Sequence, residues 1–124
     1  MRQWMVDPRI LCRKHLLGEH VEHHMFIGTI KRKCQLDGCV QNNLVEPAQF
    51  EARHNALVAE MKSRGMRHKS DIAPQEELNG LMSYLSERTR KATVNVPASL
   101  ADLIGGCPDC RARYEELKAK GVIE

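Results

Sequence analysis

A dense group of histidines and glutamates lies near the start of the chain, in the stretch HLLGEHVEHH at residues 15–24. Imidazoles and carboxylates at helical spacing can hold zinc, iron or manganese, and a carboxylate among histidines also suits acid–base catalysis. Residues four, seven and eight positions apart share a helical face, as do His15, Glu19, Glu22 and His23. His20 and His24 lie on an adjoining stripe, and a metal site would need a further ligand such as His54 or His68. A solvated polar face, a metal site and a catalytic carboxylate therefore remain three open interpretations.

The cysteines form a second group with the residue types of a metal site. Cys107 and Cys110 form a C-x-x-C motif at a predicted helix start, and Cys34 and Cys39 form C-x4-C in a predicted loop. Together these four thiolates could hold a structural zinc ion. Redox chemistry is an alternative, because thiols at helix starts have lowered pKa values, and reduced thiols without a role are a third. Cys12 is expected in the core.

The elements that must position these groups are predicted to be helices. Of the 124 residues, 42% are apolar but only 4% are aromatic. This composition favours helices over a β-sandwich and argues against disorder. A chain of this length typically forms one domain. We therefore predict a mainly α, compact single-domain helical bundle over residues 1–124, with a short extended N-terminal lead.

Prolines and glycines mark the boundaries of the predicted helices. Asp7 followed by Pro8 is typical of a helix start, and Gly65 of a helix end. The clearest helical spacing of apolar residues is that of Leu78, Leu81, Met82 and Leu85. The predicted helices cover residues 8–30, 47–64, a segment that opens at 74, 99–104 and 108–118. We expect residues 31–46 to form a loop.

Charge, cysteine count and hydropathy narrow the function classes. The net charge of +3 permits nucleic-acid binding without requiring it. Five cysteines is an odd number, and the first residues lack the apolar run of a secretory signal. A reducing, cytoplasmic location is therefore expected. No apolar run approaches the length needed to span a bilayer.

Three stretches resemble, in the right order, the phage-type pyrimidine-dimer DNA glycosylases of the endonuclease V family. HLLGEHVEHH (residues 15–24) is similar to the first-helix motif of that family, RHNALVAEMKSRGM (residues 53–66) to its second helix, and SDIAPQEE (residues 70–77) to a later segment. The family fold is a compact helical domain, which agrees with the prediction from composition. The resemblance implies a DNA glycosylase with AP-lyase activity that needs no cofactor. It also implies double-stranded DNA as partner, a monomer, and the cytoplasm of a bacterium or phage-infected cell.

Two catalytic groups follow from the resemblance. The family uses the free α-amine of the mature chain as the nucleophile at the sugar of the damaged nucleotide, together with a first-helix glutamate. The register set by His15 places that glutamate on Glu22 and the family's first residue on Met1. Arg2 is bulky and normally blocks removal of a start methionine, so we expect Met1 to be retained. As a class, α-amines are much less basic than lysine amines, so part of such an amine is neutral and nucleophilic at pH 7.

Further positions are candidate DNA contacts. Arg2 matches a family arginine near the DNA backbone, and basic groups near helix ends could contact phosphates. The candidate DNA-binding residues are Arg2, His15, His23, Lys31, Arg32, Arg111 and Arg113. Val21 and Met25 replace the family arginines beside and three residues after the catalytic glutamate. Two alternatives stay open: a metal- or zinc-stabilised DNA-binding module without catalysis, and a metal-dependent hydrolase on the histidine and glutamate face.

Overall fold

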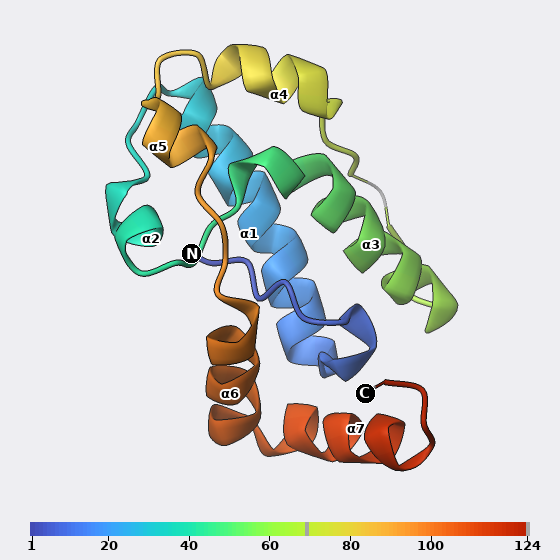
Figure 1. Cartoon of the computed structure of the whole chain (residues 1–124). Helices are drawn as coiled ribbons and strands as arrows, with labels where there is room; N and C mark the ends of the chain where they lie inside the picture. The colour runs from blue at the N-terminus through green and yellow to red at the C-terminus, as the bar shows by residue number, and fades with distance from the viewer. Residues whose placement is uncertain (69, 124) are drawn as a thin grey trace.

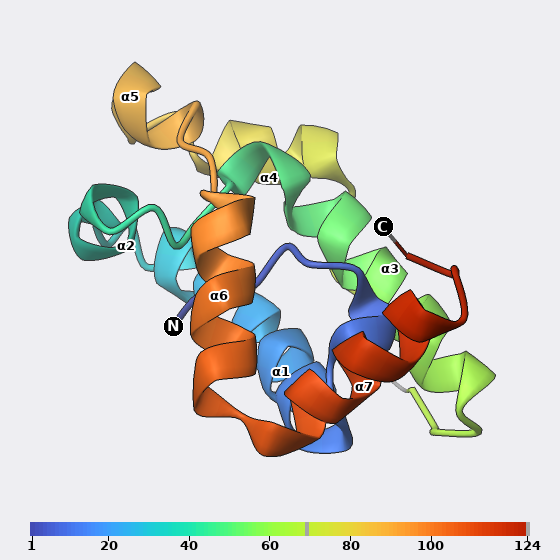
Figure 2. The ribbon, with the colours of Figure 1, turned by 60° about the horizontal axis from the view of Figure 1, so that its bottom comes forward.

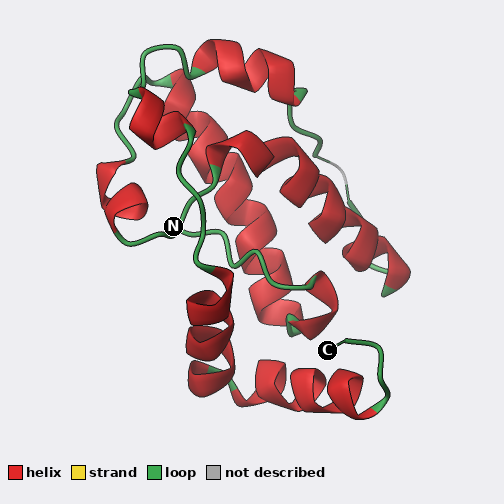
Figure 3. Cartoon of the chain, in the orientation of Figure 1, coloured by secondary structure: helices red, strands yellow, loops and turns green. Residues whose placement is uncertain are grey.

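A computed structural model describes residues 1–68 and 70–123 as a set of helices joined by short links (Figure 1). These residues contain no strand (Figure 3), so the predicted mainly α class is confirmed. The elements in chain order are η1 (Pro8–Ile10), α1 (Arg13–Lys31), α2 (Asp37–Gln41), η2 (Pro47–Gln49), α3 (Phe50–Ser63), α4 (Gln75–Leu81), α5 (Glu87–Arg90), α6 (Val96–Gly106) and α7 (Pro108–Ala119). None of these helices combines the length and apolar character that crossing a membrane requires.

The first predicted helix is divided into two elements. The carboxylate of Asp7 accepts the backbone N–H of Arg9 at 3.0 Å and so caps the short turn η1. The chain then becomes extended at Leu11, where ψ is 129°. Cys12 donates its backbone N–H at 3.2 Å to the sulfur of Cys110 instead of to a helical carbonyl. α1 therefore begins at Arg13 rather than continuing from the proline.

Other elements also differ from the prediction. α4 ends at Leu81, so Leu85 lies beyond the helix that its spacing predicted, and α5 follows as a separate helix. α6 begins at Val96 rather than at residue 99, because the side chain of Asn95 accepts the backbone N–H of Ala98 at 3.1 Å. A proline in the first turn has no N–H to lose, so Pro97 does not prevent this start. The short helix α2 interrupts the predicted loop at residues 31–46.

α1 runs through the centre of the fold and α3 lies alongside it (Figures 1 and 2). α4 contacts both helices, and η1 contacts α3 and α7. One buried apolar cluster joins the start of α1 to η1, α3, α6 and α7. A second cluster joins the end of α1 to the start of α3 and to α4. The extended lead, residues 1–6, crosses α1 on its way to η1. The fold thus brings the start of the chain against the middle of the helix that carries the histidines and glutamates.

A buried ion pair joins the two central helices. The guanidinium of Arg53 on α3 donates to both carboxylate oxygens of Glu19 on α1, at 2.6 and 2.9 Å. A third bond runs from Arg53 Nη1 to the carbonyl of Val6 in the lead at 2.6 Å. The two side chains are 6% and 0% exposed. Glu19 is therefore a structural carboxylate that fixes α1, α3 and the lead together.

Replacing Arg53 by methionine should destabilise the fold by about 3–5 kcal/mol, because the carboxylate of Glu19 would remain buried without a partner. Lys91→Met removes the Lys91–Glu87 pair, whose side chains are 75% and 69% exposed, and should cost at most about 1 kcal/mol. Urea unfolding at pH 7 compares the two variants. Equal losses of unfolding free energy would contradict the structural role assigned to the buried pair.

Candidate active site

Gln3 fixes the path of the extended lead. It is fully buried, and its backbone N–H donates to the carbonyl of Leu44 at 2.8 Å. Its side-chain oxygen accepts the backbone N–H of Glu46, and its amide nitrogen lies 3.0 Å from Nε2 of His23. Nδ1 of His23 lies 2.8 Å from the carbonyl oxygen of Glu19 and donates to it, so Nε2 accepts from Gln3. A buried network therefore holds the first residues of the chain on α1.

Glu22 is the carboxylate of α1 that interacts with the start of the chain. Burial raises its pKa above the ordinary value of a glutamate. The backbone N–H of Arg2, the α-ammonium of Met1 and the Arg2 guanidinium oppose this increase, because each stabilises the carboxylate anion. The net effect leaves the pKa of Glu22 raised above its ordinary value. The α-amine and this carboxyl group are thus electrostatic neighbours.

Two pockets lie along α1 beside these groups. The first has a volume of about 430 Å³ and is lined by Met1, Val21, His24, Met25, Gly28, Thr29 and Arg32. The second has a volume of about 250 Å³ and is lined by Arg2, Trp4, Lys14, His15, Gly18, Glu19 and Glu22. Met1 borders one pocket and Glu22 borders the other. Solvent-accessible space therefore reaches both residues.

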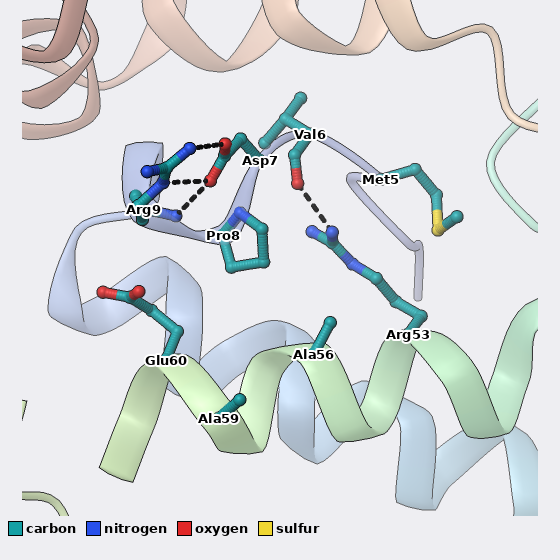
Figure 4. Close-up of a pocket in the computed structure, with 9 residues that line it drawn as sticks. All are labelled: Met5, Val6, Asp7, Pro8, Arg9, Arg53, Ala56, Ala59 and Glu60. Carbon is teal, nitrogen blue, oxygen red and sulfur yellow. Dashed lines mark hydrogen bonds and ion pairs between the residues drawn. The ribbon is translucent and has the colours of Figure 1, made fainter. Parts of the chain in front are cut away.

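The pocket of about 580 Å³ between η1 and α3 is a poorer candidate (Figure 4). Its charged side chains are already engaged with other groups of the protein. Asp7 pairs with Arg9 at 2.7 Å, and Arg53 donates to the carbonyl of Val6. Glu60 forms an ion pair with Arg64 at 2.6 Å. No acid or nucleophile described in this pocket is left free for chemistry.

The structure corrects the expected DNA-binding role of His23 and limits that of Arg2. His23 is fully buried, so DNA cannot contact it in this arrangement. The guanidinium of Arg2 lies 3.6 Å from the centroid of the Trp4 ring and donates to the hydroxyl of Ser99 at 3.1 Å. Its side chain is 20% exposed and also lies 4.0 Å from Asp102. Arg2 thus ties the lead to α6, and both its backbone N–H and its guanidinium stabilise the carboxylate of Glu22.

The other basic candidates lie at the two ends of α1. Lys31 and Arg32 are exposed where α1 ends. Arg111 and Arg113 belong to α7, which packs near η1 at the opposite end of α1 (Figure 1). Arg111 forms an exposed pair with Glu115 at 3.0 Å, and Arg113 donates to the carbonyl of Arg9. These four positions stay predictions as phosphate contacts.

The cysteine motif of α7 meets the start of α1. Sγ of Cys12 lies 3.2 Å from Nδ1 of His15 and 3.9 Å from Sγ of Cys107, while Sγ of Cys110 lies 3.6 Å from the same nitrogen. The four ligand atoms all lie within 4.8 Å of one another. Three thiols and one imidazole at such distances could hold a metal ion. His15 thus belongs to this cluster, and its contact with DNA stays a prediction.

The predicted set of four thiolates is only half right. Among the described residues, Cys34 and Cys39 belong to no group of ligands that could hold a metal with the C-x-x-C pair. Cys34 is exposed, and the sulfur of Cys39 lies 3.5 Å from the carbonyl oxygen of Met1. The group of possible ligands is completed instead by Cys12, which was expected only in the core, and by His15, the first histidine of the opening stretch.

The other histidines of the opening stretch do not form a solvated face. His20 is buried, and the centroid of its ring lies 4.9 Å from that of His54 and 5.0 Å from that of His68. Burial, with help from the neighbouring imidazoles, lowers the pKa of His20 to about 4, so the ring is neutral at pH 7. The solvated-face interpretation is therefore wrong for Glu19, His20 and His23. The two histidines expected as additional ligands do approach α1.

Two positioning residues were missed by reasoning from the sequence. Gln3 carries no motif, and only its place two residues after the candidate nucleophile could have indicated a role. Cys12 lies three residues before His15, a spacing that suits two ligands flanking a helix start. This spacing could have indicated that Cys12 is a candidate ligand.

The part of the chain that forms this site matches a known protein family. The model of one protein family, described as pyrimidine dimer DNA glycosylase, matches residues 1–74. The matched range contains the lead, α1 and α3, and therefore Met1, Gln3 and Glu22. No curated protein and no solved structure matches the chain.

Proposed function

The chain belongs to the pyrimidine dimer DNA glycosylase family, and from that premise we propose that it excises damaged pyrimidines with the α-amine of Met1 and then cleaves the strand as an AP lyase. Glu22 is the acid–base group. The observation that carries this proposal is that the α-ammonium of Met1 and the backbone N–H of Arg2 both act on the carboxyl group of Glu22. Gln3 supports the arrangement, because it fixes the lead one residue beyond that N–H.

The reaction needs no group beyond this pair. The neutral amine attacks C1′ of the sugar, the glycosidic bond breaks, and its electron pair leaves with the base, which takes up a proton. Loss of the proton from nitrogen and opening of the sugar ring give an imine. Glu22 stabilises the positive charge that develops on the sugar and carries protons between these steps. Removal of a proton from C2′ then expels the 3′ phosphate by β-elimination.

The surface beside the amine suits a base that has left the duplex stack. Met1, Val21 and Met25 are 43%, 53% and 49% exposed and are all apolar. They line the pocket of about 430 Å³ with Arg32. Enzymes that act on a damaged nucleotide bring it out of the stack and hold it against apolar and aromatic groups. This patch therefore offers a contact surface within reach of the nucleophile.

The proposal extends to the whole of residues 1–124 as one glycosylase-like domain. The family match ends at residue 74, but α6 and α7 contact the matched part directly. Ser99 of α6 donates to the carbonyl of Trp4 at 2.6 Å, and the cysteines of α7 meet Cys12. The later helices therefore help to hold the lead in place.

Inserting one glycine before Met1 tests the nucleophile. The insertion moves the α-amine by up to about 3.8 Å and leaves every described side chain unchanged. We expect cleavage of UV-irradiated duplex DNA to fall by at least about 100-fold, because reactions of this kind depend on close placement of the attacking group. Intact mass establishes that Met1 is the first residue of the reference protein. Cleavage at the original rate would contradict the proposal, and binding without cleavage by the reference protein would favour a DNA-binding module.

Replacing Gln3 by methionine tests the anchor of the lead. The change keeps the length of the side chain but removes its bonds to His23 and Glu46. We expect single-turnover excision to slow by about 10–100-fold with unchanged DNA affinity, since small misplacements of a reacting group are costly. Gln49→Met, at an exposed position, is the matched control. Equal rates for the two folded variants would show that the anchor does not position the amine.

The thiol–imidazole cluster supports a structural zinc ion. With Zn–S near 2.3 Å and Zn–N near 2.0–2.1 Å, tetrahedral ligands lie about 3.8 Å apart between two sulfurs and about 3.5 Å apart between sulfur and nitrogen. The observed separations are 3.9 Å for Cys12–Cys107, and 3.2 and 3.6 Å for the two sulfur–nitrogen pairs with His15. Backbone N–H groups reach the sulfurs of Cys107 and Cys110 as outer hydrogen bonds. Zinc here would join the start of α1 to α7.

A further inference from the structure

We propose that His20, His54 and His68, whose ligand nitrogens all lie within 4.8 Å of one another, form a second metal site with His24 beside them as a fourth imidazole. This site binds a divalent transition ion through imidazole nitrogens alone. His20 and His24 come from α1, His54 from α3, and His68 from the link that follows α3. The site shares no ligand with the thiol–imidazole cluster. It is also independent of the proposed catalytic pair.

The first argument is that the four Nε2 atoms are buried and lack a hydrogen-bond partner. His54 is fully buried, His20 is 9% exposed, and the side chain of His68 is 5% exposed. Buried nitrogen atoms without partners are rare, and each costs about 1–3 kcal/mol. The ligand nitrogens of His20, His54 and His68 lie within 4.8 Å of one another, which indicates a common partner, and His24 adds a fourth such nitrogen beside them.

The second argument is that the other nitrogen of three of these rings, those of His24, His54 and His68, lies near an acceptor. Nδ1 of His54 lies 3.1 Å from the side-chain oxygen of Asn55, and Nδ1 of His68 lies 3.8 Å from a carboxylate oxygen of Asp71. The backbone of Ser70 hydrogen-bonds to His24. Each such acceptor keeps the proton on Nδ1 and leaves a lone pair on Nε2. Lone pairs cannot bond to one another, whereas a cation can accept them all.

The third argument is the separation of the rings. An imidazole bound through Nε2 to zinc has its centroid about 3.2 Å from the ion, so tetrahedral ligands have centroids about 5.2 Å apart. The measured separations are 4.9 Å for His20–His54, 5.0 Å for His20–His68 and 5.4 Å for His54–His68. His24 lies at 4.9 Å from His20 and 5.3 Å from His54. The three pairs among His20, His54 and His68 match one shared ion, and His24 lies at a similar distance from two of these rings.

The chemistry of the ligands selects the ion. Neutral imidazoles suit zinc, nickel, cobalt and copper, whereas calcium, magnesium and manganese prefer oxygen. Asp71 behind His68 and Asn55 behind His54 are the outer partners that orient metal-binding histidines. Four protein ligands leave no open position for substrate, so the ion is structural and fastens the link after α3 to the two central helices.

Counting bound ions in the full-length protein tests the site. Titration of the metal-free chain with Co²⁺ should show two ions, only one of which gives the intense thiolate-to-cobalt absorption of the cysteine cluster. His68→Gln should retain that absorption but bind one ion. Arg67→Gln, at the exposed neighbouring position, should still bind two.

Asp71→Asn provides a test that spares the fold, because the Asp71 side chain is 93% exposed. Loss of an outer carboxylate partner should weaken the imidazole-bound ion by about 10–100-fold and leave the thiolate-bound ion unaffected. A reference protein that binds only the thiolate-associated ion would overturn the proposal. So would His68→Gln that still binds two ions, or a loss of the second ion in Arg67→Gln.

Discussion

Replacing Glu22 by glutamine should slow base excision by about 10²–10⁴-fold, the range that a well-placed acid–base group contributes. Glutamine keeps the shape of the side chain but can neither carry negative charge against the developing cation on the sugar nor transfer a proton. Glu22 is only partly buried and, unlike Glu19, forms no ion pair with a buried arginine. The variant should therefore stay folded and bind DNA as before.

Single-turnover kinetics on duplex DNA with one defined pyrimidine dimer measures this effect. Glu76→Gln, which alters an exposed carboxylate in the first turn of α4, is the matched control and should retain the full rate. Circular dichroism and a DNA-binding titration show whether fold and affinity are kept. A rate for Glu22→Gln within about threefold of the control would show that the carboxyl group takes no part in the reaction.

Replacing Cys107 by serine should release the zinc ion of the thiol–imidazole cluster and lower the melting temperature by more than about 10 °C. Structural zinc contributes about 10–16 kcal/mol of apparent binding free energy in small zinc domains, which is comparable to the whole stability of an ordinary domain, about 5–15 kcal/mol. Losing even part of this contribution would separate α7 from the start of α1. The effect should be larger than that of Arg53→Met.

Elemental analysis and thermal unfolding of the purified variants test this expectation. Cys34→Ser is the matched control, because Cys34 is exposed and lies outside the cluster; its unfolding free energy should change by no more than about 0.5 kcal/mol. A Cys107→Ser protein with the zinc content and melting temperature of the control would show that the cluster consists of reduced thiols without a metal.

The class of the fold was predictable from the sequence because local signals are strong. Asp7–Pro8 marks η1, and Pro47 and Pro108 mark η2 and α7. A composition with few aromatic residues and many leucines argues against a β-sandwich. The division of the first helix at Cys12 was not predictable in this way, because it depends on a sulfur atom of α7, far away in the sequence.

The site was predictable only in part, for a similar physical reason. Helical spacing shows which residues share a face, but it does not show which face is covered. Glu19 and Glu22 lie on the same face by spacing, yet Arg53 buries the first while the lead leaves the second partly exposed. The partners of the C-x-x-C motif likewise depend on how α7 packs against α1, and no local sequence pattern predicts that packing.

The most direct test of the central claim is to trap the imine and find the atom that carries it. Incubation with abasic-site DNA and borohydride, followed by digestion and mass spectrometry, maps the sugar fragment to one nitrogen. The account predicts the α-nitrogen of Met1. Lys14 lines the same pocket as Glu22 and is therefore the relevant competitor. A fragment on the side chain of Lys14, or no covalent product at all, would contradict the account.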